Sequence, residues 1–242
     1  MKTVTLTTLL KENSYPGRGI VLGLTPNADK AVMVYFIMGR SANSRNRVFD
    51  PIEGGIRTMA ADPAKLEDPS LIIYNPVRTL GDSHIVTNGD QTDTIYDFMQ
   101  AGKSFEDALR TRTFEPDAPN WTPRISGLVE WKEKSVGYKL SILKSADGNG
   151  DSARRYFFEY PQPVAGEGHF IHTYQKDETT LPSFEGEPRK VEIPQDVQSF
   201  ANEIWESLNA DNKVSLFVRT IDLATGKTDD CIFNGYDCVC DK

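Results

Sequence analysis

The sequence predicts an α+β fold in which two stacked, mainly antiparallel sheets are flanked by helices. Many short apolar runs are joined by turn residues at hairpin spacing, as expected for antiparallel strands. Two helical segments lie together in the middle of the chain and one near its end, without the strand–helix alternation of a parallel sheet. With 242 residues, no internal repeat and no linker-like stretch, residues 1–242 are expected to form a single domain.

The N-terminal part predicts a short helix followed by a β-hairpin. Leucines recur at helical spacing within residues 2–13. Residues 19–24 and 31–38 are apolar runs separated by a Pro-Asn-Ala-Asp turn, which is the pattern of two antiparallel strands. Arg18 enters the first strand and Arg40 leaves the second. Both arginines are therefore expected at the same end of the hairpin, where their side chains can converge.

The next part of the chain is expected to contain a loop, a short strand and a second hairpin. Prolines and glycines interrupt residues 50–68, which predicts a loop. Residues 71–74 are a short apolar run and are expected to form a buried strand. The hairpin has predicted strands at 77–80 and 84–87 that turn at a Gly-Asp pair.

Two helices and a stiff loop follow in the prediction. An Asn-Gly turn at 88–89 ends a strand, and a helix is expected to begin behind Thr92 or Asp93 as its N-cap. Backbone N–H groups at such a helix start are natural partners for an anion or a polar heterocycle. Residues 104–107 have the capping-box sequence Ser-Phe-Glu-Asp, which predicts the second helix. The proline-rich segment 114–124 is expected to be a stiff loop, and such loops commonly hold functional groups.

The second half of the chain is expected to consist mainly of strands, with one amphipathic helix. The acidic stretch 147–151 lacks the distant glutamate of a calcium loop, so a plain turn is favoured. Residues 179–194 are polar and rich in proline, which is typical of a surface excursion. Apolar residues at 3.6-residue spacing predict the helix from 197 to 208. Strands are expected at 125–131, 138–143, 154–160, 170–174, 214–221 and 231–233.

The composition limits the classes of function. A net charge of -8 argues against a nucleic-acid or membrane-surface binder, because affinity for those surfaces depends on positive charge. No apolar stretch approaches the roughly 20 residues needed to cross a bilayer, and a signal-peptide pattern is absent, so a cytoplasmic location is expected. Cys231, Cys238 and Cys240 are too few and too bunched for a disulfide framework. A structural or incidental role is therefore expected for them, and no metal site is predicted.

A basic cluster follows the second predicted strand and is a local exception in this acidic chain. Residues 39–47, Gly-Arg-Ser-Ala-Asn-Ser-Arg-Asn-Arg, contain three arginines interleaved with Ser and Asn. Guanidinium groups bind phosphate and carboxylate bidentately and stay charged at any working pH. The cluster indicates either a site for one small anion or a solvated basic turn with surface ion pairs. The run alone does not decide between them.

Six short motifs occur together between residue 15 and about residue 174. They are Tyr15-Pro16-Gly17-Arg18, Gly39-Arg40-Ser41 through Arg45, Tyr74-Asn75 leading to Arg78 and Gly81-Asp82, Asn88 to Ile95, Thr122-Pro123-Arg124-Ile125, and Thr173-Tyr174. In this order they resemble the archaeal-type IMP cyclohydrolase family. The Asn-Gly-x-x-Thr-Asp-Thr-Ile and Thr-Pro-Arg-Ile motifs are specific in combination. Trp121 is an insertion in the pattern, and the C-terminal third resembles the family only weakly.

The resemblance implies a fold, an activity and a set of site residues. The fold is N-terminal nucleophile hydrolase-like, a four-layer αββα sandwich, which agrees with the elements expected above. The activity is closure of 5-formamidoimidazole-4-carboxamide ribotide to IMP with loss of water, so the partner is a purine ribotide, and a homo-oligomer is left open. The catalytic residues that it implies are Arg45, Tyr74 and Glu115. The substrate-binding residues that it implies are Arg18, Arg40, Ser41, Asn75, Asn88, Gly89, Thr122 and Arg124.

The residue types fit this chemistry. The carboxamide nitrogen attacks the formyl carbon of the same molecule, so neither a cofactor nor an enzyme nucleophile is required. Tyr74 and Arg45 are expected to stabilise the formyl oxygen, and Glu115 is expected to take or orient a proton of the attacking amide. We assign the phosphate to Arg18, Arg40 and Ser41, and the imidazole carboxamide to Asn88, Gly89, Thr122 and Arg124.

Two other functions stay open at this point. The fold relationship raises an amidohydrolase with a processed N-terminal nucleophile, which here requires cleavage before Thr3. A non-catalytic purine-nucleotide-binding module would keep the donors and lack the reaction. A purified chain that starts at Thr3 favours the first, and tight ribotide binding without IMP formation favours the second.

Overall fold

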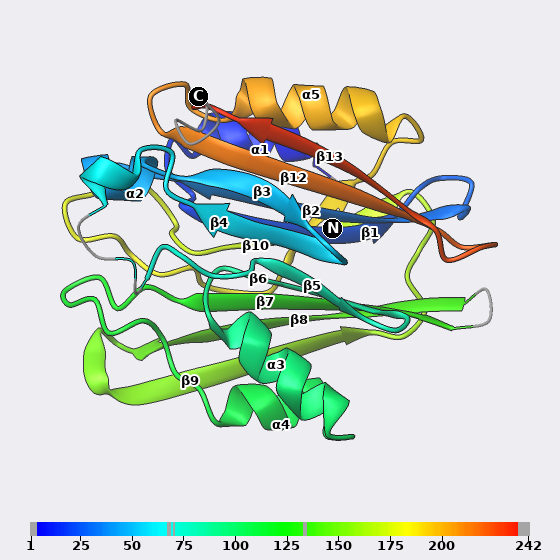
Figure 1. Ribbon diagram of the computed structural model, residues 1–242, viewed down its shortest axis with the longest axis horizontal. Coiled ribbons are helices and arrows are strands. Elements are labelled where there is room, and N and C mark those ends of the chain that lie inside the picture. Colours follow the sequence, from blue (N-terminus) through cyan, green and yellow to red (C-terminus); the bar gives the residue numbers. More distant parts are fainter. Residues whose placement is uncertain (1–3, 67–68, 70, 133–134, 237–242) are drawn as a thin grey trace.

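Two β-sheets lie face to face in the computed structural model, which describes residues 4–66, 69, 71–132 and 135–236 (Figure 1). The six-stranded sheet contains β1 (Arg18–Leu24), β2 (Lys30–Met38), β10 (Glu167–His172), β11 (Arg189–Glu192), β12 (Lys213–Asp222) and β13 (Thr228–Asn234). The seven-stranded sheet contains β3 (Val48–Ile52), β4 (Gly55–Met59), β5 (Val77–Leu80), β6 (Ser83–Thr87), β7 (Arg124–Lys132), β8 (Ser135–Ala146) and β9 (Asn149–Tyr160). Their orders are β11-β10-β1-β2-β12-β13 and β3 to β9, and neighbouring strands pair antiparallel.

Helices cover the outer faces of both sheets, as Figure 1 shows. Helices α1 (Leu6–Glu12) and α5 (Val197–Ser207) lie on the six-stranded sheet, and α3 (Gln91–Gln100) and α4 (Phe105–Arg110) lie on the seven-stranded sheet. A four-residue helix, α2 (Ala42–Arg45), follows β2, and a 3-10 turn spans Pro63–Lys65. The predicted α+β class with two stacked antiparallel sheets is confirmed.

The apolar run of β2 is explained by its place between two layers. Met33, Tyr35 and Ile37 belong to the core between the sheets, whereas the alternate residues Val34 and Phe36 pack under α1 and α5. A strand covered on both faces is apolar at nearly every position, so its sequence is a continuous run. A third cluster, which includes Ile95, Phe105 and Leu128, fixes α3 and α4 to the seven-stranded sheet.

The hairpin of β1 and β2 brings its two arginines to one end, as predicted. Arg18 stands opposite Ile37 in the antiparallel register, and the N–H of Met38 donates to the carbonyl of Gly17 at 2.9 Å. Arg40 follows two residues after the end of β2. This end of the sandwich carries the candidate site.

The predicted loop over residues 50–68 is wrong in its first half, where β3 and β4 form a hairpin. Gly54 takes the turn with a φ of +74°, a conformation that glycine adopts without strain. A Cβ on Gly55 would lie only 1.9 Å from the carbonyl oxygen of Val77, so a glycine is needed where β4 passes β5. The Pro and Gly residues that suggested a loop mark a tight turn and a close strand contact.

The predicted strand over residues 71–74 is also wrong, because this segment consists of turns and bends. Its apolar pattern comes from Ile72 and Tyr74, which are buried, while Ile73 is exposed. Thr58 of β4 holds Tyr74 in place: the Tyr74 N–H donates to Thr58 Oγ1 at 2.9 Å, and the Thr58 N–H donates to the Tyr74 carbonyl at 2.9 Å. An irregular segment thus holds Tyr74 as firmly as a strand would.

Two other elements differ from the prediction. Helix α3 begins at Gln91 behind Asp90, not behind Thr92 or Asp93, and the Asp90 side chain makes no capping bond. It binds arginines instead, as described below. Residues 179–194, expected to be a surface excursion, contain the edge strand β11 with the fully buried Val191.

The other predicted elements are present within one to five residues of their expected ends. The capping box of α4 forms as expected, with the Asp107 N–H donating to Ser104 Oγ at 3.0 Å. Residues 147–151 contain a plain turn between β8 and β9. Thr3, Cys238 and Cys240 lie outside the described residues, whereas Cys231 is half-buried on β13. None of the helices within the described ranges is long and apolar enough to cross a membrane.

Candidate active site

A cavity of about 340 Å³ opens at the end of the sandwich where β1 begins. Segments that are far apart in the sequence form its wall: the start of β1, the segment around α2, the irregular segment before β5, the loop before β7 and the segment after β10. Its lining residues are Tyr15, Arg18, Arg40, Ser41, Asn43, Ser44, Leu71, Ile72, Glu115, Asp117, Asn120, Thr122, Tyr174 and Leu181.

Arg18 is a buried cation in the wall of this cavity, with 8% of its surface exposed. Its backbone N–H donates to Thr173 Oγ1 at 3.2 Å, which fixes the start of β1. Among the described residues, its buried Nε has no hydrogen-bond partner. Burial alone would lower the pKa of the guanidinium, but the charge of Glu115 and the nearby phenols raise that pKa above its ordinary value. Arg18 therefore stays charged.

Arg47 is a second buried cation beside the first. Its side chain is fully buried, and Nε donates to the carbonyl of Ser44 at 2.8 Å. Both terminal nitrogens lack a partner within the described part of the chain. Burial, and next the charge of Arg18, lower the pKa of Arg47. Two neighbouring buried arginines whose side-chain nitrogens lack an acceptor are an arrangement that favours binding of an anion.

Arg45, for which the family resemblance implied a catalytic role, does not line this cavity. Its Nε donates to the Gly39 carbonyl at 2.9 Å and its Nη2 to Asn212 Oδ1 at 3.1 Å. It borders a separate cavity of about 310 Å³ together with Lys65. Arg47 was not among the predicted site residues, because the sequence does not show which of two arginines two residues apart in a turn is buried.

Tyr74 is close enough to the two buried arginines to feel their charges, and it bonds to a core residue, although it is not among the residues that line the cavity. Its hydroxyl shares a hydrogen bond of 2.7 Å with the hydroxyl of Tyr35, and 7% of the residue is exposed. Burial raises the pKa of Tyr74 above its usual value, whereas the charges of Arg47 and Arg18 act in the opposite direction. Tyr74 is therefore neutral near pH 7 and can donate a proton in a hydrogen bond.

Glu115 is a buried carboxyl group at the same cavity, with 2% of its surface exposed. Burial raises the pKa of Glu115 to about 7, against the opposing charges of Arg18, Arg124 and Arg47. The loop holds it in place, because the Glu115 N–H donates to the Thr122 carbonyl at 2.9 Å. A carboxyl group with a pKa near 7 exchanges protons readily in either direction at neutral pH.

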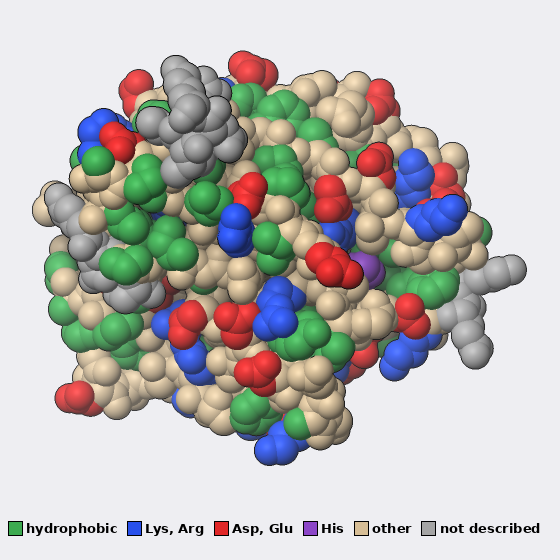
Figure 2. Space-filling model, in the orientation of Figure 1, with side chains coloured by type: hydrophobic (Ala, Val, Ile, Leu, Met, Phe, Trp, Pro, Cys, Tyr) green, Lys and Arg blue, Asp and Glu red, His purple; other side chains and the backbone are tan. Residues whose placement is uncertain are grey.

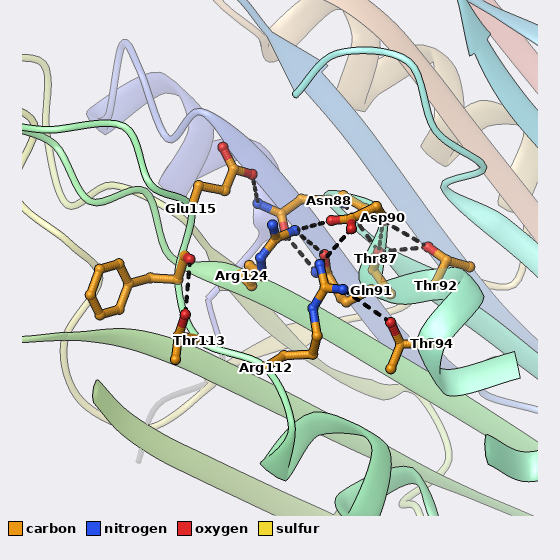
Figure 3. A network of polar contacts seen from close by, with 12 residues as sticks. Thr87, Asn88, Asp90, Gln91, Thr92, Thr94, Arg112, Thr113, Glu115 and Arg124 are labelled. Carbon is orange, nitrogen blue, oxygen red and sulfur yellow. Dashed lines mark hydrogen bonds and ion pairs between the residues drawn. The ribbon is translucent and has the colours of Figure 1, made fainter. Parts of the chain in front are cut away.

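A polar network connects Glu115 to the start of α3, as Figure 3 shows. Asn88 donates to the Pro123 carbonyl at 2.9 Å, lies 3.5 Å from Glu115 Oε1, and accepts from the Ile125 N–H at 2.8 Å. Arg124 Nη1 lies 2.7 Å from both Gln91 Oε1 and Asp90 Oδ1. Asn88 is thus saturated by the protein and holds the loop, while Asp90 and Gln91 orient Arg124.

Gly89 is needed at the centre of this network. A Cβ there would lie 2.6 Å from Arg124 Nη1, 2.7 Å from Gln91 Oε1 and 3.7 Å from Glu115 Oε1. Contacts below 3.0 Å require one of the groups to move. Gly89 therefore lets Arg124 approach the carboxyl group of Glu115.

Thr122, Asp117 and Tyr174 form a second polar group in the wall. The Thr122 N–H donates to Asp117 Oδ1 at 2.6 Å, and Thr122 Oγ1 also contacts the Asp117 carboxylate and the Tyr174 hydroxyl. Gly17 has a φ of +77°, and a Cβ there would lie 2.5 Å from the Tyr174 ring. The first motif of the chain thus packs against Tyr174, a residue of the last motif.

Arg40, Ser41 and Asn75 are placed less favourably than the buried arginines. Arg40 donates to Asp177 Oδ1 at 2.7 Å and lies over the ring of Tyr15 at 5.1 Å, so it is an ion-paired residue at the cavity mouth. Ser41 caps α2 by accepting from the Ser44 N–H at 3.1 Å. Asn75 is half-buried and follows Tyr74 without lining the cavity.

Charged side chains of both signs are mixed on one face of the molecule (Figure 2). On the face shown in Figure 2, acidic and basic side chains are interspersed, and the described residues form no continuous basic area there. Within the described ranges, no group of three or more His, Cys, Asp or Glu residues has a geometry suited to a metal ion. The buried arginines, Tyr74 and Glu115 are thus the main chemical groups of this end of the molecule.

Comparisons with known proteins agree with these observations. The family model described as "IMP cyclohydrolase-like protein" matches residues 15–227. An IMP cyclohydrolase of Methanococcus maripaludis is 36% identical over 131 residues, which cover 51% of this chain and 62% of that protein. An IMP cyclohydrolase of Methanopyrus kandleri is 26% identical over 164 residues, which cover 66% of this chain and 75% of that protein. The match therefore spans less than two thirds of the Methanococcus protein.

Proposed function

Because the chain belongs to the IMP cyclohydrolase-like family, as its motifs predicted, we propose that it closes 5-formamidoimidazole-4-carboxamide ribotide to IMP with loss of water. One observation carries this proposal. Arg18 and Arg47 are buried side by side without acceptors among the described residues, next to Tyr74 and Glu115. Such a site offers hydrogen-bond donors and one group that can exchange a proton, which is what an intramolecular dehydration needs.

The reaction sets three tasks for the protein. The carboxamide nitrogen must reach the formyl carbon, and good orientation can contribute on the order of 7 to 11 kcal/mol in such intramolecular reactions. Negative charge that develops on the formyl oxygen must be stabilised, at about 3 kcal/mol for each well-placed donor. The oxygen must then leave as water, with one proton from the attacking nitrogen and one from the formamide nitrogen.

In this proposal Tyr74 and Arg47 donate to the formyl oxygen, and Glu115 takes the proton from the attacking amide and passes it on. The pKa of Glu115 of about 7 suits both steps near neutral pH. Arg47 replaces Arg45 in the role implied by sequence, because its unpartnered nitrogens lie next to Tyr74 and Arg18. Arg45 remains a prediction that the experiment below tests.

The remaining site residues have roles in binding. Arg18 and Arg40 are the cations of the cavity wall available for the ribotide phosphate, with Ser41 at the same rim. Arg124, held by Asp90 and Gln91, faces the imidazole carboxamide across Gly89, and Thr122 lies on the same side. Asn88 and Asn75 support the segments that carry the other groups.

The proposal also includes the fold type and the domain organisation that the sequence predicted. We propose that the two-sheet sandwich with helices on both outer faces is N-terminal nucleophile hydrolase-like, and that residues 1–242 form a single domain. We also propose a purine ribotide as the substrate and a cytoplasmic location, as the sequence predicted. Whether the protein forms a homo-oligomer stays open. The alternative amidohydrolase would require a nucleophile at Thr3, which lies outside the described residues.

A spectrophotometric cyclisation assay on the purified full chain tests the proposal, with and without a chelator. We expect formation of IMP that the chelator does not change, and a loss of about 100-fold or more for Tyr74→Phe and Arg47→Ala. Arg45→Ala is the matched control two residues away and is expected to lose less than about 10-fold. Tight binding of the ribotide without formation of IMP would favour the non-catalytic binding module.

Two outcomes would change the assignment. A large loss in Arg45→Ala with an unaffected Arg47→Ala would return the catalytic role to Arg45. Wild-type rates in both Tyr74→Phe and Arg47→Ala would show that the cavity is not the site of ring closure, even in an active enzyme.

A further inference from the structure

The hydroxyls of Tyr35 and Tyr74 share one hydrogen bond, and the question is which of the two donates. We propose that Tyr35 is a positioning residue that donates its proton to the Tyr74 oxygen and so leaves the Tyr74 proton free to point at the substrate's formyl oxygen. The identity of that acceptor rests on the proposed ring closure, whereas the direction of the hydrogen bond does not.

The surroundings of Tyr35 allow its proton only one destination. The residue is fully buried in the core between the sheets, and its ring stacks on Phe49 at a centroid distance of 5.6 Å. Among the described residues, its hydroxyl has a single hydrogen-bond partner, the Tyr74 hydroxyl at 2.7 Å. A buried donor without an acceptor is strongly disfavoured, so the Tyr35 proton lies between the two oxygens.

The surroundings of Tyr74 then determine where its own proton goes. Only one proton fits between the two oxygens, so the Tyr74 proton points away from Tyr35. The charged groups that act on Tyr74 are the guanidiniums of Arg47 and Arg18 and the carboxyl of Glu115. Guanidiniums donate and cannot accept, so the Tyr74 proton is left for a substrate oxygen. A phenol that accepts one hydrogen bond is also a stronger donor in the next one.

The Tyr35 hydroxyl is an exception in the packing of β2. Its neighbours on the same face of the strand are Met33 and Ile37, which are both fully buried in the same core. A phenylalanine would keep the ring and its contact with Phe49, so packing alone does not require the oxygen atom. The hydroxyl is explained by its action on Tyr74.

A double-mutant cycle in the cyclisation assay tests the proposed role. Tyr35→Phe is expected to lower kcat about 10-fold and to change KM by less than about 2-fold. In the Tyr74→Phe background it is expected to cause no further loss of kcat, because Tyr35 acts through Tyr74. The same fractional loss in both backgrounds would overturn the proposal, since that is the signature of a general packing effect.

Tyr138→Phe is the matched control for this cycle. Tyr138 belongs to the same core, is 2% exposed, and its hydroxyl lies 2.7 Å from His169 Nδ1, away from the cavity lining. It loses a buried phenol hydrogen bond of the same length and is expected to keep the wild-type kcat. A loss equal to that of Tyr35→Phe would contradict a specific role for Tyr35.

A titration that needs no activity tests the direction of the hydrogen bond. The protein is labelled with 3-fluorotyrosine, which lowers phenol pKa values, and the fluorine NMR signal of each tyrosine is followed as the pH rises. The signal of Tyr74 is the one that is lost in Tyr74→Phe. If Tyr35 donates to the Tyr74 oxygen, its removal raises the pH at which Tyr74 ionises, because the Tyr74 phenolate then loses a hydrogen-bond donor. A Tyr74 signal that ionises no earlier in the wild type than in Tyr35→Phe would overturn the proposal. An inactive protein with the expected titration would refute only the ring closure.

The stabilities of the two single variants give an independent check. Tyr74→Phe leaves the fully buried Tyr35 hydroxyl without its hydrogen-bond partner, whereas Tyr35→Phe leaves the hydroxyl of Tyr74, a residue that is 7% exposed. Tyr74→Phe is therefore expected to have the lower unfolding midpoint in urea. A Tyr35→Phe protein that is less stable than Tyr74→Phe, or that does not fold while Tyr74→Phe does, would contradict the conclusion that the buried Tyr35 hydroxyl depends on Tyr74 as its hydrogen-bond partner.

Discussion

At the level of single residues, the carboxyl group of Glu115 is held in conditions that favour its protonated form. Burial raises its pKa from 4.5 to about 7, although three arginines act against this shift. The folded protein therefore binds this proton more tightly than the unfolded chain does. The stabilisation is fully present below about pH 4.5 and is lost as the pH rises through about 7.

Glu115→Gln is expected to remove this pH dependence. A shift of this size corresponds to roughly 3 kcal/mol, so the variant should be more stable than the wild type at pH 8 by up to about that amount and similar to it near pH 4.5. Urea unfolding at the two pH values measures the difference. Glu53→Gln, at an exposed position, is the control and should not change the pH dependence. A variant that loses stability at pH 8 would mean that the ionised carboxylate stabilises the fold.

The motifs predicted residue types better than they predicted which residue faces the cavity. Glu115 lines the cavity, and the charges of Arg18 and Arg47 act on both Tyr74 and Glu115, so two of the predicted catalytic residues belong to one end of the molecule. The sequence did not single out Arg47, because its burial depends on the four-residue helix that ends at Arg45, and the role predicted for Arg45 stays a prediction. Tyr35 was hidden in an apolar run, since a phenol in a core strand gives no signal in sequence until its partner is known.

At the level of elements, the turn between β6 and α3 contains Gly89, and the side chains of Arg124 and Gln91 lie close to its backbone. Gly89→Ala is expected to move Arg124 or Gln91, because the new Cβ would lie 2.6 to 2.7 Å from their polar atoms. The expected result is a KM for the ribotide raised about 10-fold, which corresponds to one lost charge-assisted contact. Gly137→Ala in β8 is the control, since its nearest contact would be an ordinary 3.4 Å. An unchanged KM in Gly89→Ala would remove Arg124 from the binding site.

The elements that sequence reasoning missed share one cause, which is tertiary contact. The hairpin of β3 and β4 contains Pro51, Gly54 and Gly55, and local rules assign such a stretch to a loop. In the structure Gly55 allows a close passage beside Val77, which no local rule contains. By contrast, β2 and α5 were predicted well because their apolar patterns are long and regular.

At the level of the whole molecule, a buried cation connects the two sheets at a distance from the cavity. Arg219 of β12 donates to both carboxylate oxygens of Asp230 at 2.7 Å and reaches Thr79 Oγ1 of the other sheet at 2.9 Å. Arg219 is six residues along β12 from Lys213, which places it about 20 Å from the cavity end of the strand. It contributes to holding the sheets together and takes no part in the site.

Asp230→Asn is expected to destabilise the protein without changing its kinetics. Removing the negative charge weakens the pairing of the buried Arg219, and because the Asp230 side chain is 32% exposed we expect a cost of about 1 kcal/mol. The midpoint of urea unfolding should fall while kcat and KM of the folded enzyme stay at wild-type values. Asp229→Asn, at the neighbouring exposed position, is the control. A changed KM in Asp230→Asn would show that the two ends of the sandwich are coupled.

The two buried guanidiniums of Arg18 and Arg47 also have a practical consequence for work with this protein. Any small multivalent anion would relieve their mutual repulsion, so under the proposed function inorganic phosphate and sulfate are expected to compete with the phosphate of the ribotide for Arg18. Buffers with these salts would raise the melting temperature and lower the apparent affinity, and a screen for ligands in phosphate buffer would miss weak binders. Hepes or Tris chloride is therefore the appropriate medium for a first measurement.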